Sequence, residues 1–251
     1  MLFRSWHMNI ANQVEYIATD VRRQEIPWVR ITNLKTGETT EYMSTEKPLS
    51  AKEKATAAIR KMDCMDCHNR PTHIFHPPSH SVNLALATGK IDPTLPHIKR
   101  TGVKFLAAKY PTTAAALNAI KKGVETFYHD KYPTLAKDSG DAILSAISEL
   151  QDIFRKNFFP EMKVRWDIYP DNIGHLIFPG CYRCHDGLHK SADGKVITKD
   201  CTACHTIMAQ GKPQAMAFST GLTGLVFQHP EDIGGLWQEM KCSDCHTGEL
   251  P

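Results

Sequence analysis

The first 48 residues contain short runs in which apolar and polar positions follow the pattern of β-strands. Residues 14–19 and 28–32 are rich in strand formers, and apolar and polar side chains alternate through the second run. Residues 33–37 have the composition of a tight turn, and a third run follows at 39–42. We therefore expect a small β-hairpin or sheet in this segment.

From Ser50 onward the apolar spacing changes to that of a helix. Ser50 and Glu53 form a capping-box pattern, which is typical of a helix N-terminus. This pattern predicts a helix that carries the chain to Cys64, and three prolines beyond it favour an irregular loop. The apolar stripe is Ala51, Ala55, Ala58, Ile59 and Met62, and the prolines are Pro71, Pro77 and Pro78.

Residues 98–160 have the pattern of a helical insert. Thr112 precedes one apolar stripe as a helix cap, and Pro160 ends a second stripe. We interpret both stripes as hydrophobic core, and we expect one more short helix near residues 232–240. The first stripe is Leu117, Ile120, Val124 and Phe127, and the second is Ile143, Ile147, Leu150 and Phe154.

Together these patterns predict a mainly α chain with much irregular loop structure and a small N-terminal sheet. We divide it into four segments: a β-containing segment at 1–48, a second at 49–97, the helical insert at 98–160, and a loop-rich segment at 161–251. A chain of 251 residues with 41% hydrophobic content is long enough for one or two domains with a core.

The cysteines add a chemical signal to this picture. All eight fall in four copies of Cys-x-x-Cys-His, the covalent attachment motif of c-type haem. Two thiols at this spacing can each form a thioether with one porphyrin, and the adjacent histidine is then held as an axial ligand of the iron. By chance one such motif is expected roughly 0.01 times in a chain of this composition. The cysteines are Cys64, Cys67, Cys181, Cys184, Cys201, Cys204, Cys242 and Cys245, and the histidines are His68, His185, His205 and His246.

Zinc is the main alternative, because sixteen residues separate Cys184 from Cys201 and this suits a four-cysteine site. Zinc or a disulfide framework would leave the histidine after each second cysteine unexplained. We therefore expect four covalently bound haem c groups. With aromatic residues at only 8%, we expect the haems to form much of the core and folding without haem to fail.

The net charge gives little indication of a nucleic-acid partner. The formal net charge of the chain is +3, and about eight haem propionates would bring the net charge of the holo form to roughly −5. No basic block is long enough to grip nucleic acid, and no run of eighteen apolar residues predicts a membrane span. Residues 1–7 lack the apolar core of a signal peptide. Because haem c is in general attached outside the cytoplasm, we expect a periplasmic or extracellular location, with a leader or anchor missing from this chain.

Each electron-carrying haem needs a second axial ligand, and nine further histidines are available for four irons. No methionine has an obvious ligand spacing, so we expect bis-histidine haems of low potential. The nine histidines are His7, His73, His76, His80, His97, His129, His175, His189 and His229.

Around the motifs the chain resembles the soluble portion of multihaem cytochromes of the NapC/NirT type. The resemblance is carried by residues 64–73, by 172–175 with 178–181, and by 186–189. It implies a membrane anchor, further haems and electrons taken from quinol, and it makes a membrane quinol-oxidising cytochrome a candidate partner. By the same resemblance the distal ligands are His73, His175, His189 and His229.

The resemblance leaves the other histidines without an assigned role. For His7 two roles stay open: a ligand to a haem on a missing segment or partner, or a surface histidine near a frayed end. The interpretation for the remaining four is ordinary polar residues of loops or helices. These are His76, His80, His97 and His129.

Three functions compete on these observations. Electron relay between a donor and an acceptor protein is favoured by three motifs within sixty-six residues, which must bring their haems close. A nitrite or hydroxylamine reductase needs one open iron, and the Cys-x-x-Cys-Lys motif often found in such enzymes is absent. The third is an assembling wire in which chains stack head to tail. We expect relay and no catalytic residues.

Overall fold

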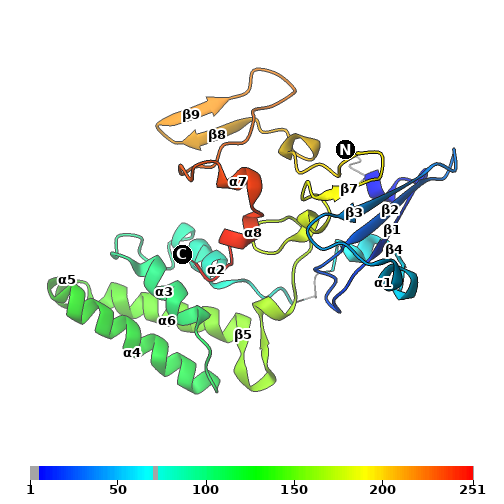
Figure 1. The fold of residues 1–251 in the computed structure, drawn as a ribbon. Helices are drawn as coiled ribbons and strands as arrows, with labels where there is room; N and C mark the ends of the chain where they lie inside the picture. The colour runs from blue at the N-terminus through cyan, green and yellow to red at the C-terminus, as the bar shows by residue number, and fades with distance from the viewer. Residues whose placement is uncertain (1–5, 70–72, 251) are drawn as a thin grey trace. The chain divides into compact units, whose positions relative to one another are not determined.

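The computed structural model describes residues 6–69 and 73–250, and its contacts group the chain into two units. The sheet unit comprises Met1–Asn69 with Asp171–Cys245, and the helical unit comprises Arg70–Pro170 with His246–Pro251. The four segments expected from the sequence are continuous stretches of chain, whereas each unit combines stretches that lie far apart in sequence (Figure 1). Pro71, part of the expected loop, lies outside the described residues.

The sheet unit is built on a five-stranded antiparallel sheet of order β4-β1-β2-β3-β7. In β1 and β2, Val14 lies opposite Ile31 and Tyr16 lies opposite Val29, and Asn33 and Gly37 close the next turn. The predicted hairpin is therefore confirmed and enlarged, because a strand from the C-terminal half joins the edge. The strands are β1 (Asn12–Ile17), β2 (Trp28–Asn33), β3 (Thr39–Ser44), β4 (Arg60–Lys61) and β7 (His189–Lys190).

The expected helix beyond Ser50 is shorter than the apolar stripe predicts. Its capping box is present, but helix α1 (Ala51–Thr56) ends after six residues and Ala57 is extended. The chain then pairs as β4 with β1, placing Arg60 opposite Tyr16. Ile59, a member of the stripe, is largely exposed. Backbone pairing at the sheet edge has therefore outweighed the weak local preference for helix.

The core of the sheet unit contacts one of the cysteine motifs. One core cluster contains Val14, Tyr16, Ile26 and Val29, and Cys184 packs against it. Burial raises the pKa of Cys184 to about 12. The rest of the unit is irregular, with short elements only. These are the β8–β9 hairpin (Ala209–Lys212 and Ala215–Phe218) and helices α7 (Leu236–Glu239) and α8 (Cys242–Cys245). Helix α7 is shorter than the helix expected at 232–240.

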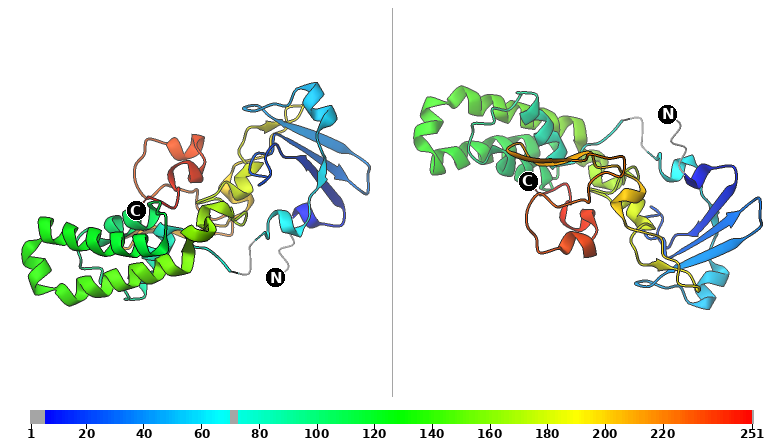
Figure 2. Two further views of the ribbon diagram at one scale, coloured as in Figure 1. Left: turned by 90° about the horizontal axis from the view of Figure 1, so that it is seen from below. Right: turned by 90° about the horizontal axis from the view of Figure 1, so that it is seen from above.

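The described part of the helical unit contains five α-helices and a small two-stranded sheet (Figure 2). The Thr112 side chain accepts a hydrogen bond from the Ala115 N–H and caps α4, as predicted. The second predicted stripe is fully buried on α6 and packs against α4. The elements are α2 (Pro78–Ala87), α3 (Ile98–Ala107), α4 (Thr113–Lys131), α5 (Pro133–Asp138), α6 (Gly140–Asn157), β5 (Phe158–Phe159) and β6 (Val164–Arg165).

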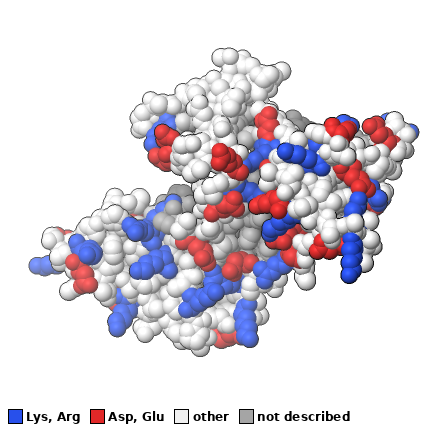
Figure 3. Space-filling view, in the orientation of Figure 1, with Lys and Arg blue, Asp and Glu red and all other residues white. Residues whose placement is uncertain are grey.

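Helix accounts for 40% of the structure and strand for 14%, so the expected excess of helix and the small sheet are both present. Lys and Arg are interspersed with Asp and Glu on the face shown in Figure 3. In the part of the chain that is described, no helix combines the length and apolarity needed to cross a bilayer.

Candidate haem-binding sites

Three of the four cysteine motifs fold into the same single turn. In each, the N–H of the second cysteine and the N–H of the histidine donate to the carbonyl of the first cysteine. These distances are 3.4 and 2.7 Å at Cys64, 3.3 and 3.0 Å at Cys181, and 3.2 and 2.9 Å at Cys201. Positions three and four apart on a helical turn share a face. The turn therefore presents two thiols and one imidazole to the same side, which attachment to a single porphyrin requires.

Acidic side chains cap the turns of the first and third motifs. Asp63 accepts a hydrogen bond from the Met65 N–H, and the Asp63 N–H donates to the Asp66 carboxylate, forming a capping box. Asp200 caps the third motif by accepting from the Thr202 N–H at 2.9 Å. The fourth motif forms helix α8, and its histidine, His246, groups with the helical unit. Short polar side chains at such positions satisfy N–H groups that a helical turn leaves unpaired.

The first two motifs are joined through Arg183, which lies between the cysteines of the second motif. Its guanidinium is buried, and among the described residues it donates to backbone carbonyls: Nη2 to Asp66 at 2.7 Å and Nη1 to Arg23 at 2.9 Å. Its Nε donates to the Gly180 carbonyl at 2.8 Å. A fourth bond, from Asn172 Nδ2 to the Asp66 carbonyl at 3.1 Å, ties the same two turns together. The separation of the two motifs is therefore fixed by their own interior residues.

Asp66, inside the first motif, anchors that motif to the sheet. The residue is 2% exposed, and its Oδ1 accepts from the Tyr16 hydroxyl at 2.6 Å and from Arg23 Nη1 at 2.6 Å. Arg60 Nε donates to the same oxygen at 2.9 Å, while Oδ2 accepts from the Asp63 N–H at 2.8 Å. Burial alone would raise the pKa of Asp66, but the bonds from Tyr16 and Arg60 outweigh it and the pKa is lowered. The carboxylate is thus held in its charged form.

The cysteines of successive motifs lie close enough to influence one another's ionisation. Burial raises the pKa of Cys67, and Cys181 of the second motif raises it further. Burial and then Cys181 raise the pKa of Cys204 in the third motif. In the fourth motif burial raises the pKa of Cys242, and Cys201 adds to this. Charge interactions of this kind fall with distance, so cysteines of different motifs in the sheet unit lie within electrostatic range of one another.

The imidazole of His185 is oriented as a metal-binding histidine is. Its Nδ1 lies 3.1 Å from the Thr198 carbonyl, so this nitrogen carries the proton and Nε2 keeps its lone pair. Nε2 faces Nε2 of His7 at 3.4 Å. The pKa of His7 is lowered mainly by burial, and electrostatic interaction with the nearby His185 lowers it further. The neutral ring is the form that can bind a metal.

His175 lies opposite the histidine of the third motif. The ring centroids of His175 and His205 are 6.1 Å apart at 68°, and His175 stacks on Tyr182 at 4.3 Å and 15°. Nδ1 of His175 is buried without a hydrogen-bond partner among the described residues. The pKa of His175 is lowered mainly by burial, and electrostatic interaction with His205 lowers it further. A buried ring nitrogen without a partner next to a motif histidine fits an axial ligand of haem c.

The other three expected distal ligands are engaged elsewhere. His189 is 1% exposed, its Nδ1 lies 2.9 Å from Asp186 Oδ1, and its Nε2 lies 2.7 Å from the Ile26 carbonyl. Nδ1 of His229 lies 2.8 Å from the Glu231 carbonyl. His73 belongs to the helical unit, and its Nε2 lies 2.9 Å from the Lys156 carbonyl. Their roles as ligands remain predictions.

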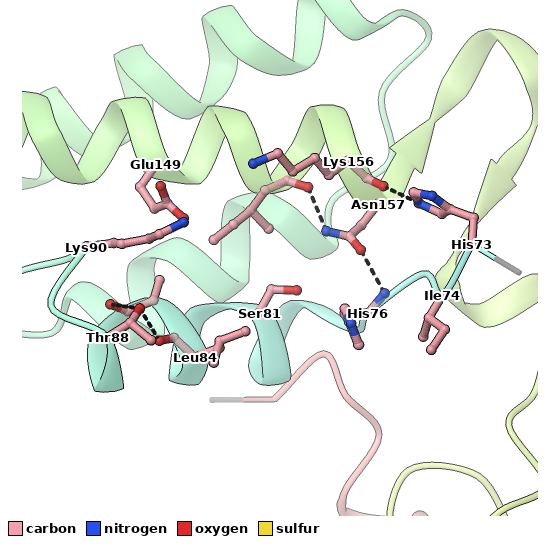
Figure 4. Close-up of a pocket in the computed structure, with 12 residues that line it drawn as sticks. His73, Ile74, His76, Ser81, Leu84, Thr88, Lys90, Glu149, Lys156 and Asn157 are labelled. Atoms are coloured by element: carbon pink, nitrogen blue, oxygen red, sulfur yellow. Dashed lines mark hydrogen bonds and ion pairs between the residues drawn. The ribbon is translucent and has the colours of Figure 1, made fainter.

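His73 also lines a pocket of about 410 Å³ in the helical unit. Figure 4 shows the Asn157 amide bridging this region, because its Nδ2 donates to the Ile153 carbonyl and its Oδ1 accepts from the His76 N–H at 2.8 Å. His76 stacks on His80 with ring centroids 4.6 Å apart. His97 and His129 are exposed residues of the same unit.

The zinc alternative requires several ligands around one point. Within residues 6–69 and 73–250 the structure contains no cluster of three or more His, Cys, Asp or Glu side chains suited to a metal ion. A bis-histidine haem iron takes only two protein side chains, fewer than such a cluster contains.

Sequence reasoning missed the two residues that position the first two motifs. Asp66 and Arg183 occupy the variable positions between the cysteines, which the motif leaves unspecified. A charged residue between the two cysteines of a motif could have indicated this role, because a charged residue buried in a tight turn needs a partner.

We expect Gly180→Ala to lower the free energy of unfolding by about 3 kcal/mol. Gly180 has a φ of +50°, and a Cβ there would lie 1.9 Å from the Gly174 carbonyl oxygen, which also accepts from the Cys181 N–H at 2.9 Å. The clash must move the loop that carries His175. Denaturant unfolding of the holo chain measures the loss. Gly37→Ala is the matched control, because Gly37 also has a positive φ but a Cβ there meets nothing within 4 Å. Equal losses for the two variants would refute the steric argument.

Comparison with known proteins gives one relative to report. The chain is 43% identical over 240 residues to the cytochrome c-type protein ImcH of Geobacter sulfurreducens. The match covers 96% of this chain and 46% of that protein, so the chain spans about half the length of this relative. No protein-family model matches the chain, and no solved structure matches it.

Proposed function

We propose that the chain is a tetrahaem c-type cytochrome that relays electrons between redox partners. The observation that carries this proposal is that three of the motifs fold into the same turn in the sheet unit, and that hydrogen bonds to the Asp66 carbonyl tie the first two turns together. A haem attached at such a motif supplies an iron that gains or loses one electron. The protein holds neighbouring attachment points close, and this is what transfer between them needs.

The site residues have defined tasks under this proposal. The paired cysteines are the attachment points, and the histidine of each motif is the proximal ligand. Thr198 keeps Nδ1 of His185 protonated and so directs Nε2 toward the metal. His175 is the distal ligand opposite His205. Burial around these rings excludes water and favours low-spin, closed irons.

The relative named as a c-type cytochrome supports covalent haem attachment and an electron-transfer role. Because c-type cytochromes are typically extracytoplasmic, we place the chain in the periplasm or outside the cell. The resemblance to NapC/NirT-type proteins makes a membrane quinol-oxidising cytochrome the candidate donor, with a second redox protein as acceptor. Nucleic acid is not among the proposed partners, because charges of both signs are interspersed on the face shown in Figure 3.

The test begins with the purified holo chain. Its mass and its haem content per polypeptide are expected to give four haems, and fewer than four would contradict the tetrahaem proposal. The visible spectrum is then recorded oxidised, reduced, and reduced with carbon monoxide. Sharp c-type bands with no carbon monoxide shift are expected for four closed irons. A shift in about a quarter of the Soret intensity would instead favour a reductase with one open iron.

A further inference from the structure

The rings of His7 and His185 face each other nitrogen to nitrogen. Their Nε2 atoms are 3.4 Å apart. Their ring centroids are 5.6 Å apart, and the angle between the ring planes is 83°. Two imidazoles that meet through these atoms are arranged like the two axial ligands of one iron. Metal–imidazole bonds are roughly 2.0 Å long, so two of them on opposite sides of one metal place the nitrogens roughly 4 Å apart. The observed separation is within about 1 Å of that requirement.

The hydrogen bonding of His185 explains why its Nε2 points at His7. Its Nδ1 proton is donated to the Thr198 carbonyl at 3.1 Å, which leaves an unshared pair on Nε2. A backbone carbonyl at the other ring nitrogen is the usual way in which proteins orient a metal-binding histidine. The ring is therefore fixed by the turn of its own motif, and it presents a lone pair to His7.

Hydrogen bonds to the start of β1 position His7. His7 lies in a 3-10 helix, Trp6–Met8, three residues before β1. The Trp6 carbonyl accepts from the Asn9 N–H at 3.2 Å and from Asn12 Nδ2 at 3.0 Å, and Asn12 begins β1. The Trp6 ring contacts the His7 ring edge-on, with centroids 5.9 Å apart. This segment is thus fastened to the sheet at the point where His7 meets the second motif.

We infer that His7 is the distal axial ligand of the iron whose proximal ligand is His185. The inference rests on the proposed function, because it requires a haem at Cys181 and Cys184. It assigns to this chain a histidine whose role the sequence left open, and the ligand acts within the same chain. The segment Trp6–Met8 then closes the iron of the second motif against carbon monoxide and other small ligands.

The expected ligand His189 is the alternative for this iron. Its two ring nitrogens contact Asp186 and the Ile26 carbonyl, and it pairs with Ser44 in the sheet. Ligation by His189 would break a buried hydrogen bond and remove a residue from β7. We assign the His189 side chain to joining β7 to the Ile26 carbonyl, where the loss of a buried hydrogen bond is costly.

The experiment compares His7→Ala with the unchanged holo chain by visible and electron paramagnetic resonance spectroscopy. The variant is expected to keep all its haems, to show one high-spin iron, and to shift about a quarter of its Soret intensity with carbon monoxide. Added imidazole should restore the low-spin spectrum by occupying the vacated position. His129→Ala is the matched control, because His129 is exposed on α4, and it is expected to leave the spectra unchanged.

A second variant, His7→Met, retains a ligand and separates ligation from a general loosening of the fold. It is expected to keep four low-spin irons while raising the reduction potential of one, as methionine ligation does. Haem content of the unchanged chain tests the proposed function separately from ligand assignment. If four haems are present and His7→Ala binds no carbon monoxide, the assignment of His7 is wrong. A potential that does not move in His7→Met would also overturn it.

Discussion

Under the proposed function, replacing His175 by alanine is expected to convert one of the four proposed low-spin irons to a high-spin form that binds carbon monoxide. The ring of His175 lies 6.1 Å from that of His205, and its buried Nδ1 has no partner among the described residues. Alanine removes the only part of the residue that reaches toward His205. A carbon monoxide difference spectrum of the reduced holo variant measures the change, and about a quarter of the Soret intensity should shift.

Two further variants make this result specific. His129→Ala removes an exposed histidine and is expected to leave the spectrum unchanged. The double variant His7→Ala with His175→Ala is expected to shift about half of the intensity, because the two histidines serve different irons. A double variant that shifts no more than either single variant would mean that both histidines act on one iron. A silent His175→Ala would remove this residue from the ligands.

The second large effect concerns stability rather than ligation. Asp66→Asn is expected to lower the free energy of unfolding by roughly 3 kcal/mol, because the charge that neutralises two arginines is lost. Oδ1 accepts bonds from Tyr16, Arg23 and Arg60, and Oδ2 accepts from the Asp63 N–H. An amide has one acceptor oxygen where the carboxylate has two, so its NH2 group must face a donor on one side. Guanidinium unfolding of the holo chain, followed by circular dichroism and by the Soret band, measures the loss.

Asp193→Asn is the control for this experiment. Asp193 also pairs with a basic residue, Lys195, at 2.9 Å, but both side chains are more than half exposed. An exposed pair contributes at most about 1 kcal/mol, so this variant should be nearly neutral. If Asp66→Asn is equally mild, the buried cluster does not hold the first motif to the sheet. If the Soret band and the circular dichroism signal change at the same denaturant concentration, the sheet and the haem environment unfold together.

Local sequence patterns predicted those elements whose stability is mostly local. The Thr112 cap and the apolar stripe from Ile143 to Phe154 identified α4 and α6, because capping and helical spacing act within a few residues. The helix beyond Ser50 was predicted too long. Its end is set by pairing of Arg60 with Tyr16, a contact that no window around residue 60 contains.

Some features of the candidate site could likewise be predicted from local sequence, and others depend on the folded chain. The cysteine motifs are local, and their positions could be read directly from the sequence. The facing histidines are not, because His7 and His185 are 178 positions apart, and only the folded sheet unit brings them together. The resemblance predicts His189 as a distal ligand, which stays a prediction, and its two ring nitrogens contact Asp186 and the Ile26 carbonyl in the structure. Ligand pairing in such a chain is therefore a property of tertiary structure.

The bridge from Arg183 to the Asp66 carbonyl has a consequence for the rate of electron tunnelling. Tunnelling probability falls exponentially with the distance between donor and acceptor, so slow fluctuations of this distance make the electron-transfer rate vary. Here a buried guanidinium binds the backbone of both turns, and its acceptors carry no protons to gain or lose. With haems at the first two motifs, this electron step should therefore be governed by a single, narrow distribution of distances, insensitive to solvent viscosity.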